Sequence, residues 1–333
     1  MNILSNKTVS NSLRIKSKSR YYIEINKISD FNNLYKFIND HSKPVIVLGE
    51  GTNIIPKDYF DGIAVKPKFN HIDFDKDKHI VSVGSSINWH FFVKEMVDKN
   101  IYGYENLSLI PGSVGASPIQ NIGAYGQDVS KLISKIDCFD YKNNKFLSLS
   151  NLDCGFSYRN SSLKDKPYII YNIDFYTNLK KSLNLEYESI QNYIKDNKLD
   201  ASLLSLNDTS KIIIDIRNSV LPDPNEIPNA GSFFKNPTMK IEDINTSDFS
   251  LNDLIIWNLG SDKVKVGAAR LIQLIKDGLD DFKNVSIYPK HALILISDGE
   301  ASQKDILNYA NNIKKVIKET FNISLDIEPT VIK

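Results

Sequence analysis

The spacing of apolar residues predicts short strands and helices that alternate along the first part of the chain. Residues 20–25 alternate between polar and apolar, as in a strand with one buried face. The run 45–48 is apolar throughout, which predicts a strand buried on both faces. Helical spacing predicts one helix that begins near Ser29 or Asp30 and another that begins near Ser85 or Ser86. Further strands are predicted over 63–65 and 79–83.

The second part continues this mixture and contains a turn-rich break. Residues 133–140 and 146–148 predict a hairpin. A helix over 211–219, capped by Ser210, is followed by Leu221-Pro222-Asp223-Pro224-Asn225, which predicts a domain boundary. The other expected elements are strands over 168–176, 285–288, 291–297 and 323–327, helices over 251–258, 266–277 and 302–320, and a helix or a loop plus helix over 183–196.

Composition narrows the class of protein. The 333 residues carry a formal charge of +1, so no general field attracts nucleic acid or an anionic membrane. No apolar run reaches the roughly 18–20 residues of a membrane-spanning helix. Two cysteines and five histidines without ligand spacing predict neither a disulfide framework nor a metal site. We expect a reducing, cytoplasmic compartment. Residues 1–23 lack acidic side chains, as transit peptides do, but their strand-like end favours an ordinary N-terminus.

Two glycine-rich segments are candidates for binding an anion. Residues 110–126 contain four glycines, so their backbone N–H groups are poorly covered by side chains and can surround a phosphate. Pro111 and Pro118 fix the shape of this loop. The segment 49–53 follows a predicted strand, where α/β folds place ligands. The segment 110–126 is neither a Walker loop nor a dinucleotide fingerprint, and a purely structural loop is an equal alternative for it.

Three side chains are candidates for chemistry. Ser232 follows a glycine and precedes two phenylalanines, which suits a tightly held proton donor or an ordinary turn. Arg159 lies among polar residues and can bind a carboxylate or remain a solvated surface residue. Glu328, near the chain end, is a candidate acid or base or an edge-strand charge.

Taken together, six segments resemble the family of UDP-N-acetylenolpyruvoylglucosamine reductases (MurB), flavoenzymes of bacterial peptidoglycan precursor synthesis. The resemblance runs nearly end to end, and Leu185-Glu186-Tyr187-Glu188 resembles the tyrosine loop of the longer subtype. The six segments are Gly49-Glu50-Gly51-Thr52-Asn53, Ile110 to Gly126, Tyr158-Arg159, Leu221-Pro222-Asp223-Pro224, Asn229 to Pro237, and Glu328-Pro329.

The resemblance implies an α+β fold with a two-part FAD-binding domain of the vanillyl-alcohol-oxidase/PCMH type and a C-terminal α/β substrate domain. Residues 1–68 and 69–219 would be the two FAD-binding subdomains, 220–324 the substrate-binding domain, and 325–333 a C-terminal strand returning to the active site. FAD is the implied cofactor, NADPH the co-substrate and a UDP-sugar the substrate. We expect a monomer with no nucleic-acid or membrane partner.

The resemblance also implies roles for single residues. Hydride addition to the enolpyruvyl ether builds negative charge on its carboxylate, which Arg159 would hold and Glu328 would accompany, while Ser232 would give a proton to C2. Tyr158, Tyr187 and Asn236 would contact the substrate. The residues expected to bind FAD are Gly49, Gly51, Thr52, Asn53, Pro111, Gly112, Ser113, Gly115, Ser117, Ile119, Gln120, Asn121 and Gly123.

Two positions depart from the family pattern. Glu50 stands where glycine is usual, and a left-handed conformation there would cost on the order of 1–2 kcal/mol. Val220 stands where lysine commonly precedes Leu-Pro-Asp-Pro as a diphosphate partner, and Lys235 is a candidate substitute. The competing hypotheses are another flavin oxidoreductase on the same FAD-binding fold, which leaves Arg159, Ser232 and Glu328 unexplained, and a non-catalytic sugar-nucleotide-binding relative.

Overall fold

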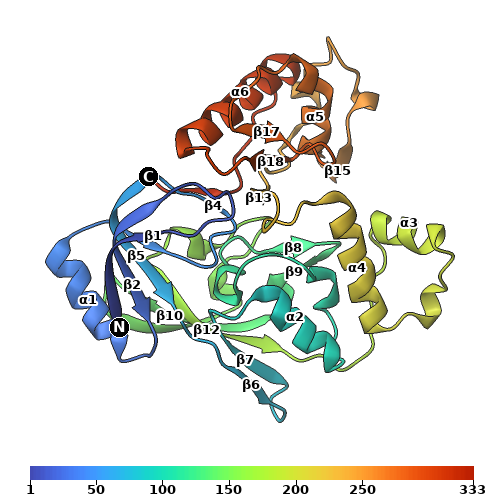
Figure 1. Ribbon diagram of the computed structural model, residues 1–333. Coiled ribbons are helices and arrows are strands. Elements are labelled where there is room, and N and C mark those ends of the chain that lie inside the picture. Colours follow the sequence, from blue (N-terminus) through green and yellow to red (C-terminus); the bar gives the residue numbers. More distant parts are fainter. The chain divides into compact units, whose positions relative to one another are not determined.

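A computed structural model describes residues 1–333, and their contacts divide the chain into two compact units. Each unit mixes helices with strands (Figure 1), so the predicted α+β class is confirmed. The chain passes between the units five times, after residues 7, 18, 50, 60 and 219. Unit 1 comprises Met1–Lys7, Ser19–Glu50 and Asp61–Ser219, and unit 2 comprises Thr8–Lys18, Gly51–Phe60 and Val220–Lys333. The four-part division expected from the sequence stays a prediction.

The first sheet has the strand order β1-β2-β5-β3, with β3 parallel to β5. Phe31 and Leu34 of α1 are buried in the core that covers this sheet. The expectation that β3 is buried on both faces is wrong, because β3 is an edge strand and Val47 is 40% exposed. The elements are β1 (Asn2–Thr8), β2 (Lys18–Ile25), α1 (Asp30–His41), β3 (Val45–Val47) and β5 (Tyr59–Pro67).

A five-stranded antiparallel sheet in the order β11-β10-β12-β7-β6 lies within unit 1. The predicted hairpin is confirmed as β10 and β11. Helix α2 buries Trp89 and Phe92 in the core of this sheet. Asn88, and not Ser85 or Ser86, caps α2, because its side chain accepts the N–H of Phe91. The elements are β6 (Ile72–Asp75), β7 (Ile80–Gly84), α2 (Trp89–Asp98), β10 (Ile133–Asp140), β11 (Lys145–Ser150) and β12 (Tyr168–Tyr176).

Three smaller elements complete unit 1. A two-stranded hairpin, β8 (Gly123–Ala124) and β9 (Gln127–Asp128), follows the glycine-rich loop. Residues 183–187 are irregular and α3 (Glu188–Asp196) follows, which confirms the loop plus helix. Helix α4 (Leu206–Val220) starts earlier than predicted, because Ser205 caps it through Asp208. Ser210 instead bonds to the buried hydroxyl of Ser108.

Unit 2 is built on two three-stranded sheets and one parallel pair. Its apolar core includes Leu13, Ile15 and Ile55 from the two early segments together with α5 and α6. The predicted helix over 251–258 is wrong: a single turn at 251–253 precedes strand β15. The predicted strand 323–327 reduces to one bridge, Phe234 to Ile327. One sheet has the order β13 (Asn229–Ser232), β18 (Ile294–Ser297) and β17 (Val285–Ile287), and the other has the order β14 (Thr238–Lys240), β16 (Lys263–Val266) and β15 (Ile256–Gly260). The parallel pair is β19 (Thr330–Val331) with β4 (Ile54–Ile55). The helices are α5 (Ala268–Ile275) and α6 (Gln303–Phe321).

None of the helices combines enough length with enough apolar character to cross a bilayer. The described residues contain no group of three or more His, Cys, Asp or Glu side chains placed to hold a metal ion.

Candidate active site

Two loops of unit 1 form a cradle of backbone amides. A Cβ on Gly49 would lie 2.9 Å from the hydroxyl oxygen of Ser113, so residues 49–50 and 112–113 are neighbours. The N–H groups of Gly49, Glu50, Gly112 and Ser113 form no hydrogen bond within the protein. Gly112 has φ +119°, which favours glycine. Four unused N–H groups at one place suit a diphosphate, so this cradle fits the diphosphate of FAD.

The rest of the glycine-rich loop is held by hydrogen bonds to the segment 85–87 and within the loop itself. The N–H of Gly115 donates to the carbonyl of Ser85 at 2.9 Å, and a Cβ on Gly115 would lie 2.5 Å from the Cβ of Ser85. The hydroxyl of Ser117 donates to the carbonyl of Val114. Residues 114–122 therefore shape the loop, while the amides open to a ligand are those of 112–113.

Glu50 causes no backbone strain. Its φ is not positive, and the left-handed residue is its neighbour Gly51, with φ +76°. Each oxygen of the Glu50 carboxylate accepts a hydrogen bond from the Asn88 side-chain amide, both at 3.2 Å. The Lys66 ammonium contacts the carbonyl of Gly49 and lies near Glu50. Burial lowers the pKa of Lys66, as does Lys68, whereas Glu50 opposes that shift. A cation therefore accompanies the acidic residue beside the cradle.

The second half of the 49–53 segment lies in unit 2. A Cβ on Gly51 would lie 2.2 Å from the carbonyl oxygen of Ser10, so only glycine fits there. The N–H of Ser12 donates to Gly51, and the Ser12 hydroxyl donates to the carbonyl of Thr52. The carbonyl of Asn53 accepts the N–H of Thr330. Segments from both ends of the chain therefore fix these three predicted FAD residues.

Arg159 lies at the corner of a tight turn in unit 1. Ser157 and Asn160 bond to each other through both backbone N–H groups, and Arg159 has φ +50°. One guanidinium nitrogen donates to the carbonyl of Gly123 at 2.7 Å, and a Cβ on Gly123 would come within 3.0 Å of the other. The Tyr158 ring, 52% exposed, lies 5.4 Å from the guanidinium carbon. Left-handed non-glycine residues of this kind cluster at functional sites.

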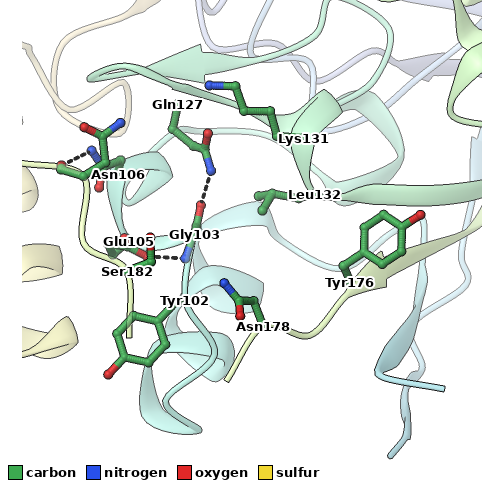
Figure 2. Close-up of a pocket in the computed structure, with 11 residues that line it drawn as sticks. Tyr102, Gly103, Glu105, Asn106, Gln127, Lys131, Leu132, Tyr176, Asn178 and Ser182 are labelled. Carbon is green, nitrogen blue, oxygen red and sulfur yellow. Dashed lines mark hydrogen bonds between the residues drawn. The ribbon is translucent and has the colours of Figure 1, made fainter. Parts of the chain in front are cut away.

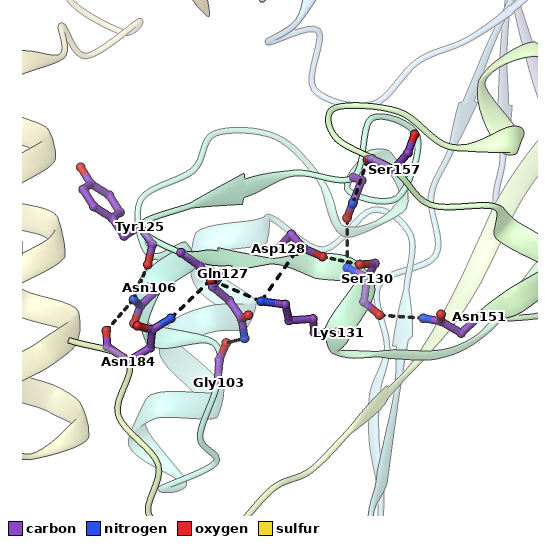
Figure 3. A network of polar contacts seen from close by, with 12 residues as sticks. Gly103, Asn106, Tyr125, Gln127, Asp128, Ser130, Lys131, Asn151, Ser157 and Asn184 are labelled. Atoms are coloured by element: carbon purple, nitrogen blue, oxygen red, sulfur yellow. Dashed lines mark hydrogen bonds and ion pairs between the residues drawn. The ribbon is translucent and has the colours of Figure 1, made fainter. Parts of the chain in front are cut away.

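The turn is fastened to the glycine-rich loop by buried polar side chains. Asn121 donates to the carbonyl of Ser157 at 3.1 Å and accepts the N–H of Ser130 at 3.1 Å. The Ser161 hydroxyl donates to the carbonyl of Ile119. Figure 3 shows how Ser157 and Ser130 take part in one polar network with the β8–β9 hairpin. Both polar ends of the Asn121 side chain are thus engaged within the protein, which makes Asn121 a positioning residue for Arg159.

A polar cavity of about 320 Å³ lies beside the same hairpin (Figure 2). Asn106, on its wall, donates to the carbonyls of Tyr125 and Asn184 at 2.8 and 2.9 Å. These bonds hold the start of the tyrosine loop against the hairpin. The Tyr187 ring meets the Tyr125 ring edge to face at 5.4 Å. Sequence reasoning did not find Asn106, because its neighbours Glu105 and Ser108 are also polar and nothing in the sequence distinguishes it from them.

Ser232 and Glu328 belong to two segments of unit 2 whose backbones pair at residues 233–235 and 326–328. The N–H of Glu328 donates to the carbonyl of Phe233 at 2.9 Å, and the N–H of Lys235 donates to Asp326 at 3.0 Å. Gly231, with φ +71°, turns the end of β13 just before Ser232. The bridge between Phe234 and Ile327 thus joins the segment that follows β13 to the C-terminal segment that carries Glu328.

The remaining predicted residues are divided between the units. Asn236 accepts the N–H of Ala268 at the start of α5, which leaves its amide N–H₂ for a ligand. Gln120 is buried in unit 1, and Tyr187 is 47% exposed. Arg159 therefore belongs to unit 1 and the pair Ser232 and Glu328 to unit 2.

Comparisons with known proteins match both parts of the chain. The family model described as FAD binding domain matches residues 19–141, and that described as UDP-N-acetylenolpyruvoylglucosamine reductase, C-terminal domain, matches residues 223–332. The UDP-N-acetylenolpyruvoylglucosamine reductase of Xanthomonas euvesicatoria pv. vesicatoria (strain 85-10) is 34% identical over 303 residues, which cover 87% of this chain and 84% of the relative. That of Porphyromonas gingivalis (strain ATCC BAA-308 / W83) is 34% identical over 327 residues, which cover 96% and 95%.

A solved structure shares the fold over nearly the whole length. The reductase (MurB) from Thermus caldophilus superposes with a TM-score of 0.64 at 18% identity, covering 97% of this chain and 96% of that one.

Proposed function

The chain belongs to the family of UDP-N-acetylenolpyruvoylglucosamine reductases, and on that premise we propose that Arg159, Ser232 and Glu328 carry its reaction. It is an FAD-dependent oxidoreductase that reduces UDP-N-acetylglucosamine enolpyruvate to UDP-N-acetylmuramate, with NADPH as the reductant, in peptidoglycan precursor synthesis. The observation that carries the residue assignment is the backbone pairing of Glu328 with Phe233, the residue that directly follows Ser232.

FAD, when bound, supplies a hydride that NADPH has provided. The substrate gains this hydride at its methylene carbon, C3, and a proton at C2. Negative charge therefore develops at C2 and spreads into the carboxylate. Arg159 holds that carboxylate, since a guanidinium stays charged and binds two oxygens at once. Ser232 gives its hydroxyl proton to C2, and Glu328 accompanies the carboxylate.

The UDP part of the substrate requires a surface for its base and partners for its phosphates. Trp257 on β15 is 43% exposed, and the Lys265 ammonium lies 4.9 Å from its ring centre. An exposed aromatic face of this kind suits stacking on a nucleobase, so we include Trp257 in the proposed substrate site. Tyr187 and Asn236 complete it. Val220 offers no charge to the diphosphate, and Lys235 remains the proposed substitute.

NADPH oxidation by the FAD-loaded protein, with and without the enolpyruvyl sugar nucleotide, tests this function. We expect oxidation that depends on the sugar nucleotide and yields the lactyl ether. Oxidation driven by oxygen alone would favour another flavin oxidoreductase, and bound flavin without turnover would favour a non-catalytic relative.

The residue roles are tested separately. Ser232→Ala should still accept electrons from NADPH but should lose reduction of the sugar nucleotide. Ser286→Ala removes an exposed hydroxyl from β17 of the same unit and serves as the matched control. Full substrate reduction by Ser232→Ala would refute the assigned proton donor.

A further inference from the structure

Lys66, near the end of β5, is a partly buried lysine whose ammonium forms one hydrogen bond and no ion pair. The bond goes to the carbonyl oxygen of Gly49. An ammonium that leaves part of its water without gaining a paired acid loses solvation free energy, so the contact with Gly49 has to bring a compensating benefit. This benefit is the question that the surrounding contacts answer.

The acids in the neighbourhood of Lys66 are bound to other residues. The Asn88 side chain donates to both carboxylate oxygens of Glu50 at 3.2 Å. The ammonium of Lys68 lies 3.8 Å from the carboxylate of Glu24. Lys66 therefore does not owe its position to a salt bridge, and the carbonyl of Gly49 is the group that holds it.

The carbonyl of Gly49 belongs to the same peptide unit as the N–H of Glu50, which is one of the four unused amides of the cradle. The chain contains no cis peptide bond, so the C=O and the N–H of this unit point in opposite directions. Lys66 thus binds the oxygen end of a peptide whose nitrogen end is open to a ligand. Pairing of β3 with β5 fixes this arrangement, since the N–H of Leu48 donates to the carbonyl of Val65 at 2.8 Å.

We propose that Lys66 is a positioning residue of the FAD site, which orients and polarises the Gly49–Glu50 peptide so that its N–H binds the cofactor's diphosphate. A cation at the carbonyl oxygen makes the N–H of the same peptide a stronger donor. It also fixes the plane of a peptide that a glycine would otherwise leave free to rotate. The inference rests on FAD as the cofactor and on the cradle as the place of its diphosphate.

The charge of Lys66 has a second effect at the cradle. The carboxylate of Glu50 belongs to the same residue as one of the open amides, and a negative charge there opposes the approach of a phosphate. The ammonium on the neighbouring carbonyl offsets this repulsion. Lys66 therefore makes a glutamate at position 50 compatible with an anionic cofactor.

The test titrates the full-length apoprotein with FAD and follows the quenching of flavin fluorescence. We expect Lys66→Met to bind FAD about 10-fold more weakly, as for the loss of one hydrogen bond to a charged group, and with a Kd that depends less on the KCl concentration. Lys66→Arg should recover part of the affinity. Lys68→Met is the matched control, because it removes a neighbouring ammonium that is paired with Glu24. An equal loss of affinity in Lys68→Met would indicate a general field and would overturn the inference.

Two further measurements separate a role through the peptide from other roles. In the apoprotein, the amide proton resonance of Glu50 should move upfield in Lys66→Met, because its peptide loses polarisation, and an unchanged resonance would overturn the inference. In a Glu50→Gln background, Lys66→Met should still weaken FAD binding. No further loss in that background would make Lys66 a counter-charge of Glu50 and nothing more.

Urea unfolding decides whether Lys66 acts on the fold or on the site. The apoproteins of wild type and Lys66→Met should unfold at the same urea concentration, whereas FAD should stabilise wild type more than the variant. An apoprotein of Lys66→Met that is less stable by as much as its holoprotein would assign the lysine to structure. If wild type itself bound no FAD, the cofactor assignment would fail, independently of Lys66.

Discussion

Gly115→Ala tests whether packing against Ser85 sets the shape of the amide cradle. The new Cβ would lie 2.5 Å from the Cβ of Ser85 and 3.0 Å from its carbonyl oxygen. Nonbonded carbons settle at about 3.5–4.0 Å, so the turn has to move away by about 1 Å or more. That movement stretches the hydrogen bond from Gly115 to Ser85, now 2.9 Å long. It also displaces the neighbouring amides of Gly112 and Ser113.

The magnitude follows from these two losses. Overpacking costs about 1–3 kcal/mol, and a weakened backbone hydrogen bond adds about 1 kcal/mol. We therefore expect the free energy of unfolding of unit 1 to fall by about 2–4 kcal/mol, a large part of the 5–15 kcal/mol typical of a folded domain. FAD affinity should fall by about 10- to 100-fold, because the amides proposed to bind the diphosphate are misplaced.

The assay uses the two tryptophans of the chain. Trp89 is buried in unit 1, whereas Trp257 is exposed in unit 2. In a Trp257→Phe background, tryptophan fluorescence during urea unfolding reports unit 1, and quenching of flavin fluorescence reports FAD affinity. Gly278→Ala is the matched control, because its Cβ would meet nothing within 4 Å and its backbone is not left-handed. If Gly115→Ala matched Gly278→Ala in both measurements, the packing argument would be refuted.

Three further predictions concern buried polar groups of unit 1. Asn121→Asp should lower kcat/KM by about 10- to 100-fold while FAD stays bound, because its new oxygen faces the carbonyl of Ser157 and loosens the turn that carries Arg159. Unchanged kinetics would contradict a role of Asn121 in positioning Arg159, the proposed carboxylate partner. Burial raises the pKa of Asp140, but hydrogen bonds from the following loop outweigh burial and leave the pKa below its usual value. Its stabilisation should therefore be complete above pH ~4 and lost as pH falls through the folded-state pKa, so urea midpoints of wild type and Asp140→Asn should converge in acid. Burial raises the pKa of Cys138 to about 12 and that of Cys154 to about 11, so a thiol reagent at pH 8 should label neither until urea is added, and rapid labelling of the native protein would contradict this.

Local patterns predicted those elements whose partners are close in sequence. The hairpin of β10 and β11 and the helix α6 appear where periodicity placed them. The segment 251–258 shows why the rest failed. Its apolar residues have helical spacing, but Ile256–Gly260 pairs with β16, and cross-strand pairing outweighed the local preference. Likewise β3 is continuously apolar, yet its place at a sheet edge leaves Val47 exposed, and no local signal reports an edge.

The site was predicted through motifs and not through geometry. The resemblance named Arg159, but the left-handed turn and its fastening by Asn121 depend on contacts between distant segments.

The five passages of the chain between its units have a consequence for synthesis in the cell. The N-terminal segment 8–18 belongs to unit 2, where the carbonyl of Ser12 accepts the N–H of Asn229. These partners are separated by about 217 residues, so at roughly 5–20 residues per second the ribosome delivers the second about 10–40 s after the first. During that interval Leu13 and Ile15, both fully covered in the finished protein, have no core to enter. Unit 2 is consequently completed last although its first segment, 8–18, is among the earliest parts of the chain to be made.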